Sequence, residues 1–342
     1  MRGSDAVPVR ASEPRVAGHA PAPDSRAWIV VQAAYQRLIS PLSGASGPSM
    51  AFVKLHLVDA TFELFRAYYS RPEEHGPDGR PVNAVRGLIE SMLSLLREPD
   101  ATHIAAATDH VIESWRNDVY PRYKSSVGMD PQLLTQFDDA ERALRALGIT
   151  TWAMVEDEAD DGIAAGVGRF SDDPRLEQVV ICSVDKDLAQ CVRGERVVLR
   201  DRMRTITYDE AGVVAKFGVE PESIPDYLAL VGDSSDGYPG LPGWGSKSAA
   251  AVLAKFKHLE EIPASPLEWG VPLRNAVRLA ATLQQQRADA FLYKRLATLN
   301  ADAAIAGDLD SLEWVGAPRD EFLALCDELG FDRIRERVHR WA

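Results

Sequence analysis

The chain has 342 residues, of which 46% are hydrophobic, and carries a formal net charge of −13. This length can bury a large core and favours two globular units. Its apolar runs are far shorter than the roughly 20 residues of a membrane span, so no membrane association is expected. Three cysteines without Cys-x-x-Cys spacing argue against a disulfide framework or a cysteine zinc site and fit a reducing cytoplasm.

Residues 1–50 differ in composition from the rest of the chain. They are dominated by Ala, Pro, Ser, Gly and Arg, which predicts a disordered tail. Near-helical spacing of Trp28, Val31, Tyr35 and Leu38 favours a helix over 26–39. This segment lacks the apolar core of a signal peptide, so a cytoplasmic location is expected.

From Phe52 onward, strand-like and helix-like patterns alternate. This alternation predicts an α/β fold with a parallel sheet flanked by helices. An amphipathic helix is expected at Val82–Leu96. The expected strands are Val53–Val58, His103–Ala107, Thr151–Val155, Val179–Cys182 and Val197–Leu199.

After about residue 206 the helical period dominates and no further strand is predicted. We therefore expect a tail at 1–50, an α/β unit at 51–205 and an all-helical unit at 206–342. The expected helices are Asp209–Phe217, Pro221–Leu230, Lys247–Phe256, 272–297 and 319–338.

Carboxylates recur at the ends of the apolar runs, where a parallel sheet binds its ligands. Two such charges about 5 Å apart repel by about 3 kcal/mol at an effective dielectric of about 20, so a cluster of them requires cations. Oxygen donors without His or Cys indicate Mg²⁺ or Mn²⁺. The candidate ligands are Asp59, Asp109, Glu158, Asp160, Asp161, Asp185, Asp187, Asp233 and Asp236.

Each acidic motif also has a simpler interpretation. Asp185 and Asp187 could lie in a solvated turn after a strand, and the acidic run 158–161 could complement the dipole of a helix N-terminus. The segment around Asp233 and Asp236 could be an ordinary polar loop. Only the set as a whole favours a metal site.

A glycine-rich turn follows Asp236 and leads into a helix N-terminus. Free N–H groups at such a terminus favour a phosphate. The turn is not a P-loop, because Ser246 separates Gly245 from Lys247. A tight turn without a ligand is the alternative for this segment alone.

In order along the chain, these motifs resemble those of the bacterial 5′–3′ exonuclease and flap endonuclease family, which includes the 5′-nuclease domain of DNA polymerase I. The resemblance covers about residues 53–341. It implies a PIN-like sheet followed by a helix-three-turn-helix region. No polymerase-like region follows, so we expect a free-standing relative. The motifs are LVDA…FRAYY, TD…WR…YPRYK, EDEADD, SVDKD and DYLALVGDSSDGYPGLPGWGSKSA.

The resemblance also implies two divalent metal sites that activate a water and stabilise the leaving oxygen of a phosphodiester. The inner set would be Asp59, Asp109, Glu158, Asp160, Asp185 and Asp187. The outer set would be completed or supported by Asp161, Asp233 and Asp236.

For DNA, the resemblance implies a monomer that binds 5′ ends, flaps or nicks. Arg66 and Lys124 would contact the scissile phosphate, and Arg116 matches a basic family position. The glycine-rich turn would approach duplex DNA and hold K⁺ through its carbonyls. Its residues are Gly240, Gly243 and Gly245, with Lys247 and Ser248 meeting phosphates.

One departure concerns the segment after Tyr123-Lys124. Relatives usually carry a further basic residue there, and this chain has Ser125–Met129. Two other functions stay open: a PIN-like ribonuclease, and a non-catalytic structure-specific DNA-binding protein. The glycine-rich region favours duplex DNA over RNA, and the complete inner set favours catalysis.

Overall fold

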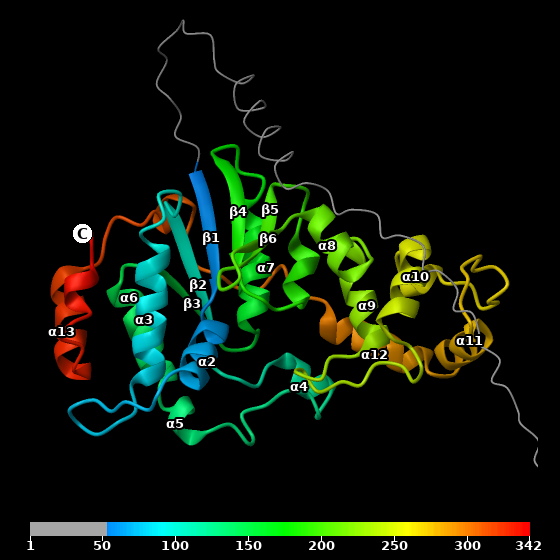
Figure 1. The fold of residues 1–342 in the computed structure, drawn as a ribbon, viewed down its shortest axis with the longest axis horizontal. Helices are drawn as coiled ribbons and strands as arrows, with labels where there is room; N and C mark the ends of the chain where they lie inside the picture. Colours follow the sequence, from blue (N-terminus) through cyan, green and yellow to red (C-terminus); the bar gives the residue numbers. More distant parts are fainter. Residues whose placement is uncertain (1–52) are drawn as a thin grey trace, which may run out of the picture. The chain divides into compact units, whose positions relative to one another are not determined.

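The computed structural model describes residues 53–342. The predictions for the tail and for a helix over 26–39 lie outside these residues. Six strands form one sheet in the order β3-β2-β1-β4-β5-β6 (Figure 1). The first five strands along the chain pair in parallel, and β6 is antiparallel to β5, so the predicted parallel α/β sheet is confirmed. The strands are β1 Val53–Asp59, β2 His103–Asp109, β3 Thr150–Met154, β4 Leu176–Cys182, β5 Val197–Asp201 and β6 Ile206–Tyr208.

Helices connect the strands and cover both faces of the sheet. Successive side chains of a strand point to opposite faces, so each central strand is apolar on both. Leu57 and Ile181 face α7 and the helical region, whereas Val58 and Val180 face α2, α3 and α6. The helices of this part are α2 Ala60–Ser70, α3 Asn83–Leu95, α4 Trp115–Val119, α5 Pro131–Leu134, α6 Phe137–Ala146 and α7 Ala159–Phe170, with a 3₁₀ turn η1 at Asp187–Cys191.

The second half of the chain is almost entirely helical. The predicted helix over 272–297 is two helices that meet at Gln286, and the one predicted over 319–338 ends at Leu329, because Gly330 adopts φ +75°. The helices are α8 Glu210–Phe217, α9 Ile224–Val231, α10 Ser246–Phe256, α11 Ala276–Gln285, α12 Arg287–Ala297 and α13 Arg319–Leu329.

Two elements correct the prediction of an all-helical unit at 206–342. Strand β6 extends the sheet beyond residue 206, since its backbone pairs with Leu199–Asp201. Helix α13 lies beside α6 (Figure 1). Its Phe322 and Leu325 share a core with Leu144 of α6. Among residues 53–342, no helix has both the length and the apolar character needed to span a bilayer.

Candidate metal centre

The carboxyl edge of the sheet brings the predicted carboxylates together. Asp59 is the last residue of β1 and Asp109 the last of β2, whereas Asp185 lies in the loop after β4. Glu158 precedes α7, which begins after β3. The expected placement of these residues at strand ends is confirmed, because parallel strands present all their carboxyl ends at one edge.

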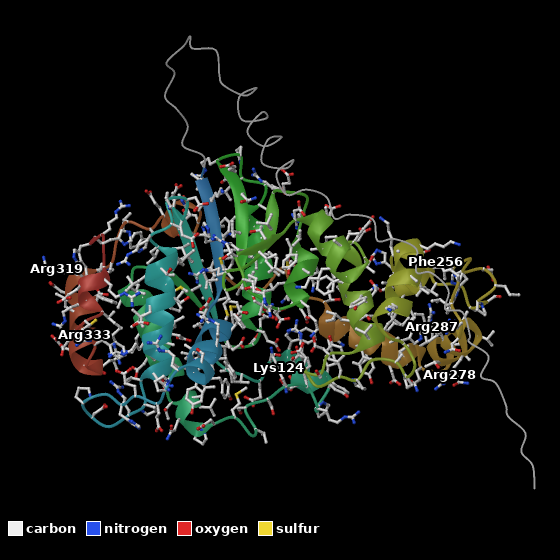
Figure 2. The ribbon with its side chains drawn as sticks, viewed as in Figure 1. Lys124, Phe256, Arg278, Arg287, Arg319 and Arg333 are labelled. Carbon is white, nitrogen blue, oxygen red and sulfur yellow. The ribbon has the colours of Figure 1, made fainter. Side chains whose placement is uncertain are left out.

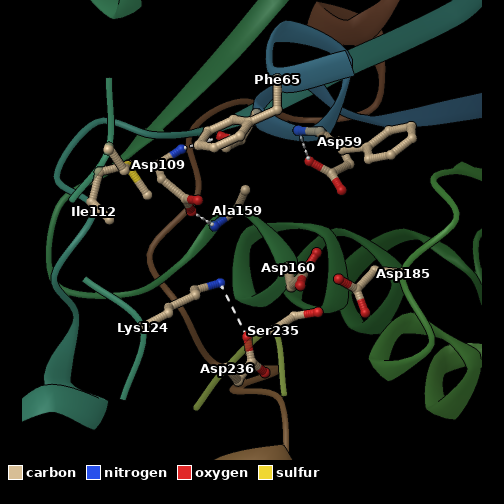
Figure 3. Close-up of a pocket in the computed structure, with 13 residues that line it drawn as sticks. Asp59, Phe65, Asp109, Ile112, Lys124, Ala159, Asp160, Asp185, Ser235 and Asp236 are labelled. Carbon is tan, nitrogen blue, oxygen red and sulfur yellow. Dashed lines mark hydrogen bonds and ion pairs between the residues drawn. The ribbon is translucent and has the colours of Figure 1, made fainter. Parts of the chain in front are cut away.

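A cavity of about 370 Å³ opens at this edge (Figure 3). Five of the predicted carboxylates line it, together with Lys124 and an apolar rim that includes Phe65 and Met129. The view places Asp160 and Asp185 across from Asp59, with Asp236 below them (Figure 3). The five carboxylates are Asp59, Asp109, Asp160, Asp185 and Asp236.

A second group of carboxylates adjoins this cavity. One oxygen each of Asp187, Asp233 and Asp236 lies within 4.8 Å of the other two, and all three residues are buried. Within residues 53–342, Asp187 Oδ1 is buried and has no hydrogen-bond partner. A buried oxygen without a donor needs a proton or a cation, so the group fits a hard divalent ion.

Burial and mutual repulsion raise the pKa values of several of these acids, among them Asp59, Asp160, Asp187 and Asp236. Burial raises the pKa of Asp59 to about 7, aided by Asp109 and Asp185 and opposed by hydrogen bonds from Phe62 N and Ser183. Burial likewise raises the pKa of Asp236 to about 6. The pKa values of Asp160 and Asp187 are also raised, by burial first and by Asp185 next. Cation binding at such a site therefore competes with protons.

Two lysines offset part of the negative charge. Lys124 Nζ lies 2.9 Å from Glu158 Oε2 and 3.8 Å from Asp236 Oδ1, and its side chain is 26% exposed. Burial alone would lower its pKa, but the surrounding carboxylates hold the pKa well above its ordinary value. Lys186, which the sequence reasoning missed although it stands between Asp185 and Asp187, pairs with Asp233.

Hydroxyl groups orient two of the acids. Ser183 Oγ donates to Asp59 Oδ2 at 2.8 Å, and Ser114 Oγ donates to Glu158 Oε1 at 2.7 Å. Tyr123 Oη donates to the other Glu158 oxygen at 3.3 Å. Sequence reasoning missed these three, and only Tyr123 carried a signal, as the neighbour of Lys124.

The glycine-rich turn forms a separate groove of about 410 Å³ at the start of α10. Gly243 and Gly245 are exposed along it, and Lys247 and Arg274 supply positive charge. Arg274 was missed because no local pattern links it to a turn that lies about thirty residues earlier. Ser248 Oγ accepts from Gly245 N at 3.0 Å, which caps the helix. Arg278 lies at this end of the molecule too (Figure 2).

Residues 54–218 match the family model of the 5′-3′ exonuclease N-terminal resolvase-like domain, and residues 219–320 match that of the 5′-3′ exonuclease C-terminal SAM fold. The chain belongs to the 5′-3′ exonuclease family. It is 34% identical over 304 residues to DNA polymerase I of Pseudomonas aeruginosa, an alignment that covers 84% of this chain and 32% of that protein. The chain thus spans about a third of the length of the curated relatives it matches.

Solved structures share the fold of this 5′-3′ exonuclease family member. The bacteriophage T5 flap endonuclease, in a pseudo-enzyme–product complex with DNA and metal ions, superposes with a TM-score of 0.59 at 16% identity, covering 83% of this chain and 97% of that one. Flap endonuclease-1 from Methanococcus jannaschii gives a TM-score of 0.53 at 13% identity, covering 87% and 94%. At these identities the likeness concerns the fold alone.

Arg116 matches a basic position of the family, but the prediction that it contacts DNA is wrong. Its side chain is 1% exposed and lies in the interior, where Nη1 and Nη2 donate to the two oxygens of Asp161 at 2.6 and 2.8 Å. Its Nε donates to Leu296 O at 2.8 Å. A guanidinium enclosed in this way has no surface to offer a phosphate.

Of the two roles predicted for Asp161, completing or supporting the outer metal set, the structure contradicts the first. Besides the guanidinium, Asp161 accepts from Glu158 N at 3.0 Å and from Asn300 N at 2.7 Å. Four hydrogen bonds occupy its two oxygens, so it is not free to ligate a metal as predicted. It instead fixes the start of α7 and joins it to the segment after α12.

Two further predicted residues have other contacts than expected. Arg66 pairs with the buried Glu63 and does not line the cavity, so its contact with a scissile phosphate stays a prediction. Gly240 is buried with φ +68°, and a Cβ there would lie 2.3 Å from Gly232 N. Its predicted approach to DNA is therefore wrong, because it packs against its own chain. Gly245, in contrast, has open space around its Cβ direction.

Proposed function

We propose that this chain is a divalent-metal-dependent 5′ nuclease that hydrolyses phosphodiester bonds of DNA carrying 5′ ends, flaps or nicks. The observation that supports this proposal most directly is the carboxylate-lined cavity. The same site holds a buried oxygen of Asp187 without a hydrogen-bond partner and the positive charge of Lys124. Membership of the 5′-3′ exonuclease family supports hydrolysis that starts from the 5′ end of a strand.

The donor set supports Mg²⁺ or Mn²⁺ as the metal, because every ligand is a carboxylate oxygen. When bound, such ions supply an activated water and charge neutralisation at the leaving oxygen. Asp233 and Asp236 would hold a second ion together with Asp187. The remaining ligands would be Asp59, Asp109, Asp160 and Asp185, which line the cavity, and Glu158, once Lys124 has released its oxygen.

The chain's own cations would position the DNA. Lys124 lies on the cavity wall, where it can exchange its contact with Glu158 for a phosphate oxygen and stabilise developing charge. Lys247, Arg274 and the N–H groups at the start of α10 would hold a backbone phosphate of the duplex. This binding reads the DNA backbone and carries no sequence specificity.

Further parts of the proposal rest on the family resemblance. They are a nuclease unit that ends with β6, a DNA-binding region from α8 onward, K⁺ at the glycine-rich turn and a monomeric state; the cysteine content adds a cytoplasmic location. A gel-filtration and light-scattering measurement tests the monomer, and a K⁺ titration of duplex affinity tests the monovalent site.

End-labelled flap, nicked, blunt and single-stranded DNA, with matched RNA strands, test the activity with and without Mg²⁺. We expect Mg²⁺-dependent release of short 5′ products from DNA. Asp185→Asn should abolish cleavage and retain DNA binding, whereas Asp332→Asn, at a side chain that is 88% exposed, should cleave normally. Metal-independent cleavage, full activity of Asp185→Asn, or exclusive RNA cleavage would contradict the proposal.

A further inference from the structure

A buried histidine without a partner lies on the central strand of the sheet. His56 of β1 is 0% exposed and points to the same face as Val58. Within residues 53–342, neither ring nitrogen has a hydrogen-bond partner. A buried polar group without a hydrogen-bond partner is destabilising, so a ligand that binds this imidazole would supply the missing partner.

Two carboxylates from the connection between α3 and β2 face this imidazole. One ring nitrogen of His56 and one oxygen each of Glu98 and Asp100 all lie within 4.8 Å of one another. Both carboxylates are half-buried, and neither belongs to the carboxylate centre at the other edge of the sheet. Contraction by an ångström or two would bring the three groups to the distances of a metal site.

Basic side chains already orient the two carboxylates. Asp100 Oδ2 lies 3.1 Å from Lys54 Nζ, and Glu98 Oε2 lies 2.6 Å from Arg200 Nη1. Each of these ion pairs engages one oxygen of its carboxylate. Partners of this kind fix ligating carboxylates in metal sites. Lys54 and Arg200 are 25% and 23% exposed, so both can turn toward solvent as positive charge enters.

An entry path adjoins the cluster. A cavity of about 380 Å³ is lined by Glu98, Asp100, Lys54 and Arg200, together with Val180 and Val198 of the neighbouring strands. An ion can therefore reach the carboxylates without passing through the core.

We propose that His56, Glu98 and Asp100 form a metal site separate from the carboxylate centre, and that this site binds one first-row transition-metal dication of the Zn²⁺ class. Imidazole nitrogen favours such ions over Mg²⁺, which prefers an all-oxygen shell. Burial lowers the pKa of His56 to about 4, with Asp100 opposing and Arg200, Lys54 and Arg202 reinforcing the effect. The imidazole is therefore neutral at pH 7 and loses no proton on binding. The bound ion would tie the α3–β2 connection to β1.

The nitrogen ligand separates this site from the all-oxygen centre. Zn²⁺ is titrated calorimetrically into the full-length chain with excess Mg²⁺ present, and one equivalent of Cu²⁺ is examined by pulsed electron paramagnetic resonance for imidazole nitrogen coupling. The variants are His56→Gln and the double variant Glu98→Gln/Asp100→Asn. The control is His75→Gln, at a side chain that is 46% exposed.

We expect one Zn²⁺ equivalent in the wild type and in His75→Gln, weakened at least about tenfold in the other two variants. The nitrogen coupling should disappear in His56→Gln. Should that variant not fold, the double variant decides, since it leaves the core histidine in place. Unchanged Zn²⁺ binding in the double variant, or coupling that survives in His56→Gln, would overturn the proposal. Neither measurement depends on nuclease activity.

Discussion

Replacing Arg116 by Met tests whether this residue serves the fold or the DNA. The substitution keeps much of the apolar volume but removes the charge that pairs with Asp161. The carboxylate then keeps only the N–H groups of Glu158 and Asn300, and the carbonyl of Leu296 loses its donor. The variant therefore buries an uncompensated charge.

Removing one partner of a buried ion pair costs about 3–5 kcal/mol. Roughly 290 residues are described, for which the entropy of unfolding is about 0.6 kcal/mol/K. The expected fall in melting temperature is then about 5–8 °C for a two-state transition. Neutralising the stranded carboxylate should recover part of this loss, so Arg116→Met/Asp161→Asn should melt above Arg116→Met.

Differential scanning calorimetry measures the stability, and fluorescence anisotropy with a labelled flap duplex measures affinity over a range of salt concentrations. Arg333→Met is the matched control, because this exposed arginine lies near α13 (Figure 2), whereas Arg116 pairs with Asp161 in α7. If Arg116 contacted DNA, its loss would instead weaken duplex binding and reduce the salt dependence of that binding by about one phosphate contact. An unchanged melting temperature together with that loss of affinity would refute the structural role.

Three further predictions concern the candidate site. Burial raises the pKa of Asp59 to about 7, so in EDTA the stability contributed by its protonated form is fully present below about pH 4 and is lost as the pH rises to and through 7. Calorimetry should therefore show Asp59→Asn gaining stability relative to the wild type between about pH 4 and 7. If Asp59→Asn gained no stability relative to the wild type over this range, the pKa of Asp59 would not be raised in the folded protein. Lys124→Ala should slow single-turnover flap cleavage by about 10²–10³-fold with little change in DNA affinity, and a parental rate would remove this lysine from the mechanism. Gly245→Val should weaken duplex binding without loss of stability, whereas Gly240→Ala should lower the melting temperature. Equal effects of the two variants in both assays would contradict the assignment of Gly245, and not Gly240, to the DNA surface.

Local pattern was sufficient for the sheet and for the positions of most candidate ligands. Apolar runs predict parallel strands, and a residue that ends such a run, like Asp59 or Asp109, has only one edge of the sheet to occupy. Eight of the nine predicted carboxylates therefore lie at or beside the cavity or pair with its cations.

What the sequence did not predict depends on contacts between distant segments. Arg116 is buried by the end of α12, some 180 residues later, and no local pattern reports that packing. Gly240 carries the same composition signal as Gly245, but its surroundings are set by the backbone at Gly232. Lys186 stands within a predicted motif, yet its pairing with Asp233 depends on how two loops meet.

The contacts that enclose Arg116 and Asp161 also fix how far the metal centre lies from the helical region. They join the start of α7, which carries Asp160, to the chain just after α12, and Gln190 adds bonds to Ala297 O and Leu299 N. If α10 binds a phosphate of the duplex, these contacts fix the distance between that phosphate and the metal centre. Cleavage would then fall at a constant number of nucleotides from the junction, and loosening these contacts would scatter the cut positions before it abolished cutting.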